Sequence, residues 1–228
     1  MAQEAQEQVR LAVFDYDGTI MDGQSGQLFA VYLLRHGLIS TRTALRLGWW
    51  GARYKIHLPY RQDEARELIF RDIGRLDHDH VMRIMGDFYA EVLEPRTRAD
   101  AVSEVAACRE MGLTCVLVSA TFFEMARVAA QNLGIERVAA TRMELDEQGH
   151  FTGAVAGEVV AGEGKVRAVT ALANEAFGEG AWTIERAYGD HFTDESLLEL
   201  AAEPVAVDPG TTLARIARRR GWKIASWS

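Results

Sequence analysis

Two aspartates near the start of the chain, Asp15 and Asp17, end an apolar run and are separated by one residue. The run at residues 9–14 is too short for a helix and rich in β-formers, so it predicts a buried strand of a parallel sheet. Ligands bind at the carboxyl ends of such strands in open α/β sheets. Two carboxylates placed there repel each other unless a cation or a shared proton relieves them. The pair therefore predicts a charged site at one edge of a sheet.

Further groups suited to phosphate chemistry stand at the ends of later apolar runs. Ser119 ends a second predicted strand, Asp190 ends a later strand, and Lys165 begins a helix between them. Carboxylates are hard oxygen ligands that suit Mg²⁺, and a hydroxyl and an ammonium can hold phosphoryl oxygens. With the phosphate held in this way, Asp15 could attack as a nucleophile. Asp17 could protonate the leaving alcohol and later activate water.

The elements that must position these residues fall into two kinds. Residues 22–95 show only helical patterns, whereas strands and helices alternate from residue 96 onward, which predicts βαβ units and a parallel sheet covered on both faces. We therefore expect an α/β core from residues 1–21 and 96–228, with an all-helical insertion between them. Expected strands are residues 9–14, 113–118, 137–140, 183–188 and 204–207, with a hairpin at 142–146 and 150–155. Expected helices are 24–35, 43–57, 62–74, 77–93, 98–111, 122–133, 162–177, 194–201 and 210–220, with a helix-breaking segment at 58–60.

Composition narrows the classes of function. The net charge of -8 argues against a nucleic-acid-binding protein, which needs a basic surface to contact phosphates. Residues 1–8 lack the basic start and apolar core of a signal peptide, and no run approaches the length of a spanning helix. Cys108 and Cys115 lack zinc or redox spacing, so we expect reduced core residues and a cytoplasmic protein.

Four motifs in this order resemble those of the haloacid dehalogenase superfamily. They are Asp-x-Asp-Gly-Thr at 15–19, Val-Ser-Ala-Thr at 118–121, the isolated Lys165, and Gly-Asp-x-x-x-Asp at 189–194. The resemblance covers nearly the whole chain and is strongest to the phosphoserine phosphatase subgroup. It implies a doubly wound parallel sheet with a Rossmann-like core, and it identifies residues 22–95 as a helical cap domain.

The resemblance also implies a role for each motif residue. Asp15 is then the nucleophile and a metal ligand, and Asp17 is the acid/base whose backbone carbonyl also binds Mg²⁺. Asp190 is the third metal ligand, while Ser119 and Lys165 bind the phosphate. The dehalogenases of the superfamily lack the second aspartate, so its presence favours phosphoryl chemistry over cleavage of a carbon–halogen bond.

Supporting roles follow from the same resemblance. Gly18 and Ala120 stand where the family offers backbone amides to the phosphoryl group. Asp194 would orient the lysine or support the metal. His191 follows the third metal ligand where relatives carry a small residue, so it would narrow the site or reach the substrate. Thr193 stands at a position where the phosphoserine enzymes have an asparagine.

Two residues of the insertion are candidates for binding the substrate. Gln24 occupies the position where the phosphoserine enzymes place a glutamate that recognises the substrate ammonium. A neutral amide cannot supply that charge, which argues against phosphoserine itself. Arg53 is a candidate for binding an anionic part of the substrate.

The segment around Trp49 and Trp50 has three interpretations: a cap face that touches the core, a dimer contact, or a membrane-surface patch. Arg42 and Arg46 lie nearby, and basic residues beside aromatic ones suit an interfacial helix. The sequence leaves these interpretations open, together with the choice between monomer and homodimer.

These observations predict a Mg²⁺-dependent phosphomonoester hydrolase. It would act on a small phosphorylated metabolite through an aspartyl-phosphate intermediate. Two alternatives stay open: a membrane-associated phosphatase of lipid phosphates, and a non-catalytic, phosphate-binding regulatory module. Vesicle binding would favour the first alternative, and a lack of turnover on a generic aryl phosphate with Mg²⁺ would favour the second.

Overall fold

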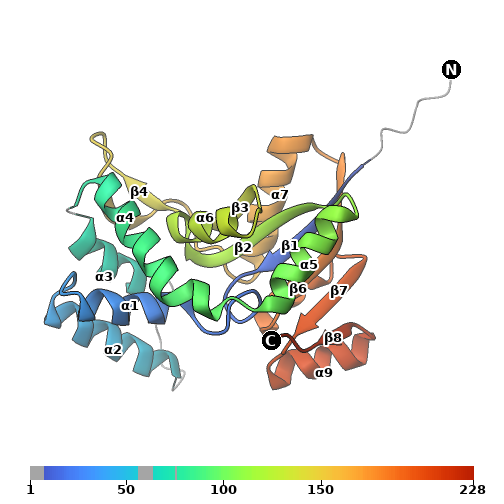
Figure 1. The fold of residues 1–228 in the computed structure, drawn as a ribbon, viewed down its shortest axis with the longest axis horizontal. Helices are drawn as coiled ribbons and strands as arrows, with labels where there is room; N and C mark the ends of the chain where they lie inside the picture. The colour runs from blue at the N-terminus through green and yellow to red at the C-terminus, as the bar shows by residue number, and fades with distance from the viewer. Residues whose placement is uncertain (1–7, 56–63, 75) are drawn as a thin grey trace.

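The computed structural model describes residues 8–55, 64–74 and 76–228 (Figure 1). The predicted helix-breaking segment at 58–60 lies outside the described residues. So do residues 1–7, which make up most of the segment that lacks the features of a signal peptide. Among the described residues, no helix has both the length and the apolar character needed to cross a membrane.

A sheet of six parallel strands forms the centre of the molecule, in the order β3-β2-β1-β6-β7-β8. The first strand, β1, pairs with β2 on one side and with β6 on the other, so the carboxyl ends of these three strands are neighbours. The predicted α/β fold with a doubly wound sheet is confirmed. The strands are β1 (Val9–Asp15), β2 (Thr114–Phe122), β3 (Arg137–Thr141), β6 (Trp182–Gly189), β7 (Glu203–Val207) and β8 (Lys223–Ala225).

Alternate side chains of β1 enter two hydrophobic layers, one on each face of the sheet. Leu11 and Val13 pack on the side of α7, α8 and α9, whereas Ala12 and Phe14 pack on the side of α5 and α6. The Phe14 ring stacks on Tyr188 of β6 with 4.3 Å between ring centroids. The helices are α5 (Ala99–Glu110), α6 (Phe123–Asn132), α7 (Glu163–Phe177), α8 (Glu195–Leu198) and α9 (Thr211–Arg220).

The segment between β1 and α5 is helical in the residues that the structure describes. Figure 1 shows its helices gathered to one side of the sheet. Phe29 of the first helix contacts Phe88 of the fourth and Phe122 at the end of β2, with centroids 4.9 Å and 5.8 Å apart. The segment is therefore joined to the sheet by aromatic packing. Its helices are α1 (Ser25–Arg35), α2 (Thr41–Lys55), α3 (Glu64–Ile73) and α4 (His78–Phe88), followed by a π-helix at Tyr89–Leu93 and a 3₁₀ turn at Glu94–Arg96.

The predicted hairpin is present as β4 (Met143–Leu145) and β5 (Phe151–Val155). It does not extend the main sheet but packs on α3, and Figure 1 shows β4 beside the helical segment. Phe70 of α3 contacts Phe151 of β5 and Phe122 of β2, each at 4.8 Å between centroids. The hairpin thus links the helical segment to the chain that follows β3.

One strand was not expected from the sequence. Strand β8 is three residues long and mostly exposed at the sheet edge, so it lacks the apolar run that marks a buried strand. The strand pairs with β7, and the Asp208 carboxylate stabilises the chain just beyond it by accepting hydrogen bonds from Ser226 and Trp227.

Two glycines of the helical segment allow a matched test of the α3–hairpin contact. A Cβ atom at Gly74 would lie 2.4 Å from the Phe70 carbonyl oxygen and 2.5 Å from that of Phe151, whereas one at Gly86 would meet nothing within 4 Å. We expect Gly74→Ala to lower the free energy of unfolding by about 1–3 kcal/mol through overpacking. Gly86→Ala should instead raise it by up to about 1 kcal/mol through helix propensity. Urea unfolding measures both, and equal effects would contradict this account.

Candidate active site

Predicted catalytic, phosphate-binding and metal-binding residues converge at the carboxyl ends of three neighbouring strands. Asp15 ends β1, Ser119 lies near the end of β2, and Asp190 follows β6 directly. Lys165 comes to the same place from the first turn of α7. The parallel pairing of β1 with both β2 and β6 brings these ends together, as expected for an open α/β sheet.

Lys165 lies at the centre of this site. Its Nζ donates to Asp15 Oδ1 and to Asp194 Oδ1, each at 2.6 Å, and all three side chains are buried. The helix that carries Lys165 approaches the loop before it closely, because a Cβ atom at Gly164 would lie 2.7 Å from the Val159 carbonyl oxygen. Glycine at position 164 therefore lets the helix start where the lysine can reach both carboxylates.

Burial and charge act against each other in this cluster. Burial raises the pKa of Asp15 well above its usual range, and the Lys165 charge opposes that rise. Burial, followed by the charge of Asp194, raises the pKa of Asp190 to about 6. Burial alone would lower the pKa of Lys165, but Asp15 and Asp194 reverse this effect and raise it. The lysine therefore stays charged, and its charge favours the ionised form of Asp15 against the effect of burial.

Three carboxylates of the cluster could hold a metal ion. Asp15, Asp190 and Asp194 each offer an oxygen, and these oxygens lie within 4.8 Å of one another. Lys165 contacts two of the three groups, so one buried ammonium faces three carboxylates. Hard oxygen donors with excess negative charge fit Mg²⁺. Asp194, which we expected only to orient the lysine or support the metal, is therefore one of the three candidate metal ligands.

The carboxylate of Asp17 lies apart from that group. Its Oδ1 accepts from the Ser25 backbone N–H at 2.8 Å and its Oδ2 from Ser25 Oγ at 2.9 Å. Ser25 Oγ also shares a hydrogen bond of 2.8 Å with Thr121 Oγ1 at the end of β2. Burial raises the pKa of Asp17, and the two Ser25 hydrogen bonds oppose that rise. The Asp17 side chain thus binds Ser25, and the predicted contact of its backbone carbonyl with metal stays a prediction.

Sequence reasoning did not identify Ser25 as a partner of Asp17. Ser25 is the first residue of α1 and is fully buried. A serine at a helix start is common, so nothing in the sequence distinguished it as a residue that would bind the second aspartate.

Gly18 differs from its expected role. Its N–H, expected to face a phosphoryl group, donates to the Met21 carbonyl oxygen at 2.9 Å. The residue adopts φ +82°, and a Cβ atom there would lie 2.2 Å from Asp190 Oδ2. Glycine at position 18 therefore makes room for the Asp190 carboxylate, in a backbone conformation that other residues rarely adopt.

Ser119 and Ala120 lie beside the carboxylates at the end of β2. Ser119 is buried, and its Oγ accepts from the Thr121 N–H at 3.1 Å. The Ala120 carbonyl oxygen accepts from Arg66 Nε and Nη2, at 3.2 Å and 2.5 Å, and from Thr141 Oγ1 at 3.0 Å. Arg66 belongs to α3, so the helical segment supplies a guanidinium to this edge of the site. No motif in the sequence distinguished Arg66 from the other arginines.

The turn after β6 holds Asp194 in place. Its Oδ2 accepts from the His191 N–H at 3.2 Å, while the His191 ring bonds with Thr193. A Cβ atom at Gly189 would lie 2.8 Å from Asp194 Cβ, so this turn is also closely packed. His191 is partly buried, which lowers its pKa, and Thr193 is exposed. Their predicted roles toward a substrate stay predictions.

The two predicted substrate-binding residues of the insertion lie on different helices. Gln24 is exposed and precedes α1, where its side chain makes no capping hydrogen bond. Arg53 of α2 forms an ion pair with Glu64 of α3 at 2.6 Å. The pair joins two helices of the segment, and the predicted contact of Arg53 with substrate stays a prediction.

Comparisons with known proteins agree with this geometry. A family model described as haloacid dehalogenase-like hydrolase matches residues 12–199. A Mycobacterium tuberculosis protein named "Probable phosphatase" is 31% identical over 223 residues, which are 95% of this chain and 75% of that protein. Another protein of this organism, named phosphoserine phosphatase, is 27% identical over 219 residues, which are 93% of this chain and 69% of that one. A solved structure of a protein of unknown function from Bordetella pertussis Tohama I matches with a TM-score of 0.86 and 28% sequence identity. The match covers 96% of this chain and 98% of that one.

Replacement of Gly18 by alanine should disrupt the carboxylate group. Gly149 provides a control, because it has φ +81° but a Cβ atom there would meet nothing within 4 Å, so both alanine variants place a side chain at an unfavourable positive φ. Only Gly18→Ala displaces Asp190. We expect it to weaken Mg²⁺ binding about tenfold or more in isothermal titration calorimetry, through misplacement of one ligand. Gly149→Ala should bind as the parent does, and an equal loss in the two variants would contradict the role of Gly18.

Proposed function

Because the chain belongs to the haloacid dehalogenase-like hydrolase family, we propose that it is a Mg²⁺-dependent phosphomonoesterase. The reaction passes through an aspartyl-phosphate on Asp15, and the substrate is a small phosphorylated metabolite. The observation that carries this proposal is the buried Lys165, bonded to both Asp15 and Asp194 beside Asp190. The resemblance of the motifs to the family is confirmed by the match of its model.

In the first step, an oxygen of Asp15 attacks phosphorus and the bond from phosphorus to the ester oxygen breaks. Asp17 gives its proton to the leaving alkoxide, and the raised pKa that burial produces suits an acid. Lys165 and Ser119 bind the phosphoryl oxygens and reduce their charge as the carboxylate approaches. The products of this step are an alcohol and an acyl phosphate.

In the second step, water attacks the phosphorus of the acyl phosphate and the bond to Asp15 breaks. Asp17, now ionised, takes a proton from that water, which restores both aspartates and releases orthophosphate. Bound Mg²⁺, held by Asp15 and Asp190 with support from Asp194, would supply positive charge for the phosphoryl group. The splitting of one displacement into two lets the same carboxyl group act first as acid and then as base.

We further propose that residues 22–95 act as a cap domain over a core of residues 1–21 and 96–228. Support comes from the contacts of the helical segment with the site: Ser25 of α1 binds Asp17, and Arg66 of α3 binds the Ala120 carbonyl. A cap in this position would exclude water and choose the leaving group. The neutral Gln24 argues against phosphoserine as the substrate. Cys108 and Cys115 are free and buried, which supports a reducing compartment.

Asp15→Asn should abolish hydrolysis. An amide is a poor nucleophile and carries no charge to bind metal, so we expect turnover of p-nitrophenyl phosphate with Mg²⁺ to fall by a factor on the order of 10³ or more. Asp87→Asn, at an exposed position on α4, is the control and should keep parent rates. Circular dichroism confirms that each variant is folded. A folded Asp15→Asn variant with near-normal rates would show that the nucleophile lies elsewhere, and a parent without activity would favour the phosphate-binding module.

Ser25→Ala should shift the pH dependence of turnover. The Ser25 hydrogen bonds lower the pKa of Asp17, so loss of the hydroxyl should raise it. A hydrogen bond to a charged group contributes about 1.5–3 kcal/mol, which corresponds to roughly one to two pKa units. We expect the limb of the kcat–pH profile that reports Asp17 to move to higher pH by about one unit or more. Ser103→Ala, exposed on α5, should leave the profile unchanged, and an unmoved limb in Ser25→Ala would refute the link.

A further inference from the structure

Helix α2 is basic in a protein whose overall charge is acidic. Its fifteen residues, Thr41–Lys55, include no aspartate or glutamate, whereas the whole chain has a net charge of -8. The preceding helix α1 contains no acidic residue either and ends with Arg35. Helices α1 and α2 therefore form a basic part of an acidic chain, as does α9, whose ten residues include four arginines and no acidic residue.

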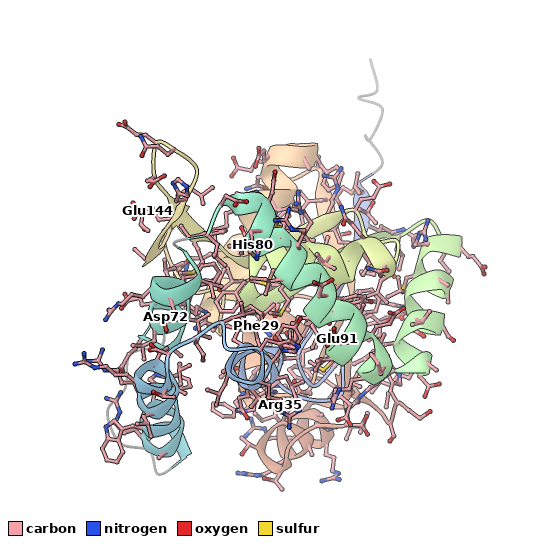
Figure 2. All side chains as sticks on the ribbon, turned by 60° about the vertical axis from the view of Figure 1, so that its left-hand side comes forward. Phe29, Arg35, Asp72, His80, Glu91 and Glu144 are labelled. Carbon is pink, nitrogen blue, oxygen red and sulfur yellow. The ribbon has the colours of Figure 1, made fainter. Side chains whose placement is uncertain are left out.

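The outer side of α2 combines this charge with large apolar side chains. Leu45 and Trp49, four residues apart, are 76% and 62% exposed, and Leu45 is the more exposed of the two. Arg42 and Arg46 are also exposed, three residues before each of these apolar residues. Residues three and four apart share one side of a helix, so the four side chains form one surface. Figure 2 shows side chains of α2 extending outward at the edge of the molecule.

The opposite side of the same helix is occupied by packing. Thr43 is buried, and Ala44 and Leu47 pack against the hydrophobic core. The exposed Leu45 and Trp49 are therefore not needed to attach α2 to the protein. Large apolar side chains that are this exposed on a well-packed helix indicate a surface that contacts a partner molecule or a membrane.

Two acidic groups of the neighbouring helix α3 are bonded to other partners. On α3, Glu64 pairs with Arg53 and the Asp72 carboxylate accepts from the Ser40 N–H at 2.8 Å. Within the described part of the chain, neither Arg42 nor Arg46 forms an ion pair. The positive charge of this surface is thus free to attract an external anion.

We propose that the surface formed by Arg42, Leu45, Arg46 and Trp49 docks on an anionic lipid membrane. An interfacial helix inserts its apolar side chains at the boundary between headgroups and acyl chains, where tryptophan is favoured, while arginines bind lipid phosphates. A second copy of this chain fits less well, because a two-fold contact would set the same positive surface against itself. The docking concerns α2 alone and does not depend on which phosphate ester the site hydrolyses.

Vesicle sedimentation tests this docking with the full chain and without substrate. We expect the protein to pellet with vesicles of phosphatidylcholine mixed with phosphatidylglycerol but not with phosphatidylcholine alone, and to be released as salt is raised. Arg42→Glu/Arg46→Glu should lower the partition coefficient about tenfold or more, since two attractive charges become repulsive. Arg218→Glu/Arg219→Glu, the same charge change at exposed positions of α9, is the matched control and should have a much smaller effect.

The apolar part of the surface is tested in the same assay. Leu45→Ala/Trp49→Ala should also weaken pelleting, whereas Val102→Ala/Leu200→Ala, at exposed apolar residues outside α2, should not. Quenching by brominated lipid gives a second measurement: the parent should be quenched, and Trp49→Phe should lose most of that quenching. All substituted side chains are exposed, and thermal unfolding verifies that each variant is folded.

Three results would overturn the proposal. The first is failure of the parent to pellet with anionic vesicles, or equal pelleting with neutral ones. The second is an equal loss in the α9 control, which would indicate net charge rather than a surface. The third is a dimer, seen by size-exclusion chromatography without lipid, that Leu45→Ala/Trp49→Ala dissociates; α2 would then be an interface between copies of this chain.

Discussion

The buried ion cluster around Lys165 is the constraint on which the rest of the site depends. A buried carboxylate without a partner is costly, and removal of one member of a buried pair typically costs about 3–5 kcal/mol. Lys165 offsets this cost for Asp15 and Asp194 at once, with both contacts at 2.6 Å. The end of β1, the start of α7 and the turn after β6 must therefore meet within hydrogen-bonding distance of one ammonium group. The sheet order, with β1 between β2 and β6, makes that meeting geometrically simple.

Close backbone packing is the second requirement of the cluster. A Cβ atom at Gly18 would overlap the Asp190 carboxylate, one at Gly164 would approach the Val159 carbonyl, and one at Gly189 would press on Asp194. Each of these glycines adjoins or faces a charged residue of the site. The charged groups are therefore held at their separations by the backbone as well as by their hydrogen bonds. This explains why the carboxylates remain together despite mutual repulsion, which raises the pKa of Asp190 after the larger effect of burial.

The sequence predicted the part of the site that lies at strand ends and little of the part that helices supply. A buried strand has a clear apolar pattern, and the residue that follows it has a fixed place at the sheet edge, so Asp15, Ser119 and Asp190 could be placed together. Ser25 contacts Asp17, 8 residues away in the sequence, and Arg66 contacts Ala120, 54 residues away. Both contacts depend on how the helices pack, which no local sequence pattern encodes. The hydrogen bond from the Gly18 N–H to the Met21 carbonyl oxygen was not expected for a related reason, because the turn between the two residues was not visible in the sequence.

The difference between site residues at strand ends and site residues on the inserted helices has a physical origin. Strand ends are fixed by a sheet that is buried on both faces, so the groups placed there keep their geometry while surface residues change. The helical segment packs through one hydrophobic face, in which aliphatic side chains accompany aromatic contacts such as Phe29 with Phe88 and Phe122, and its outer side chains have no such constraint. The inserted helices can therefore bring different residues over the same ion cluster and present different residues to the surroundings. With the functions proposed above, residues 22–95 would select the phosphate ester and contact the membrane, while the sheet would hold the catalytic groups.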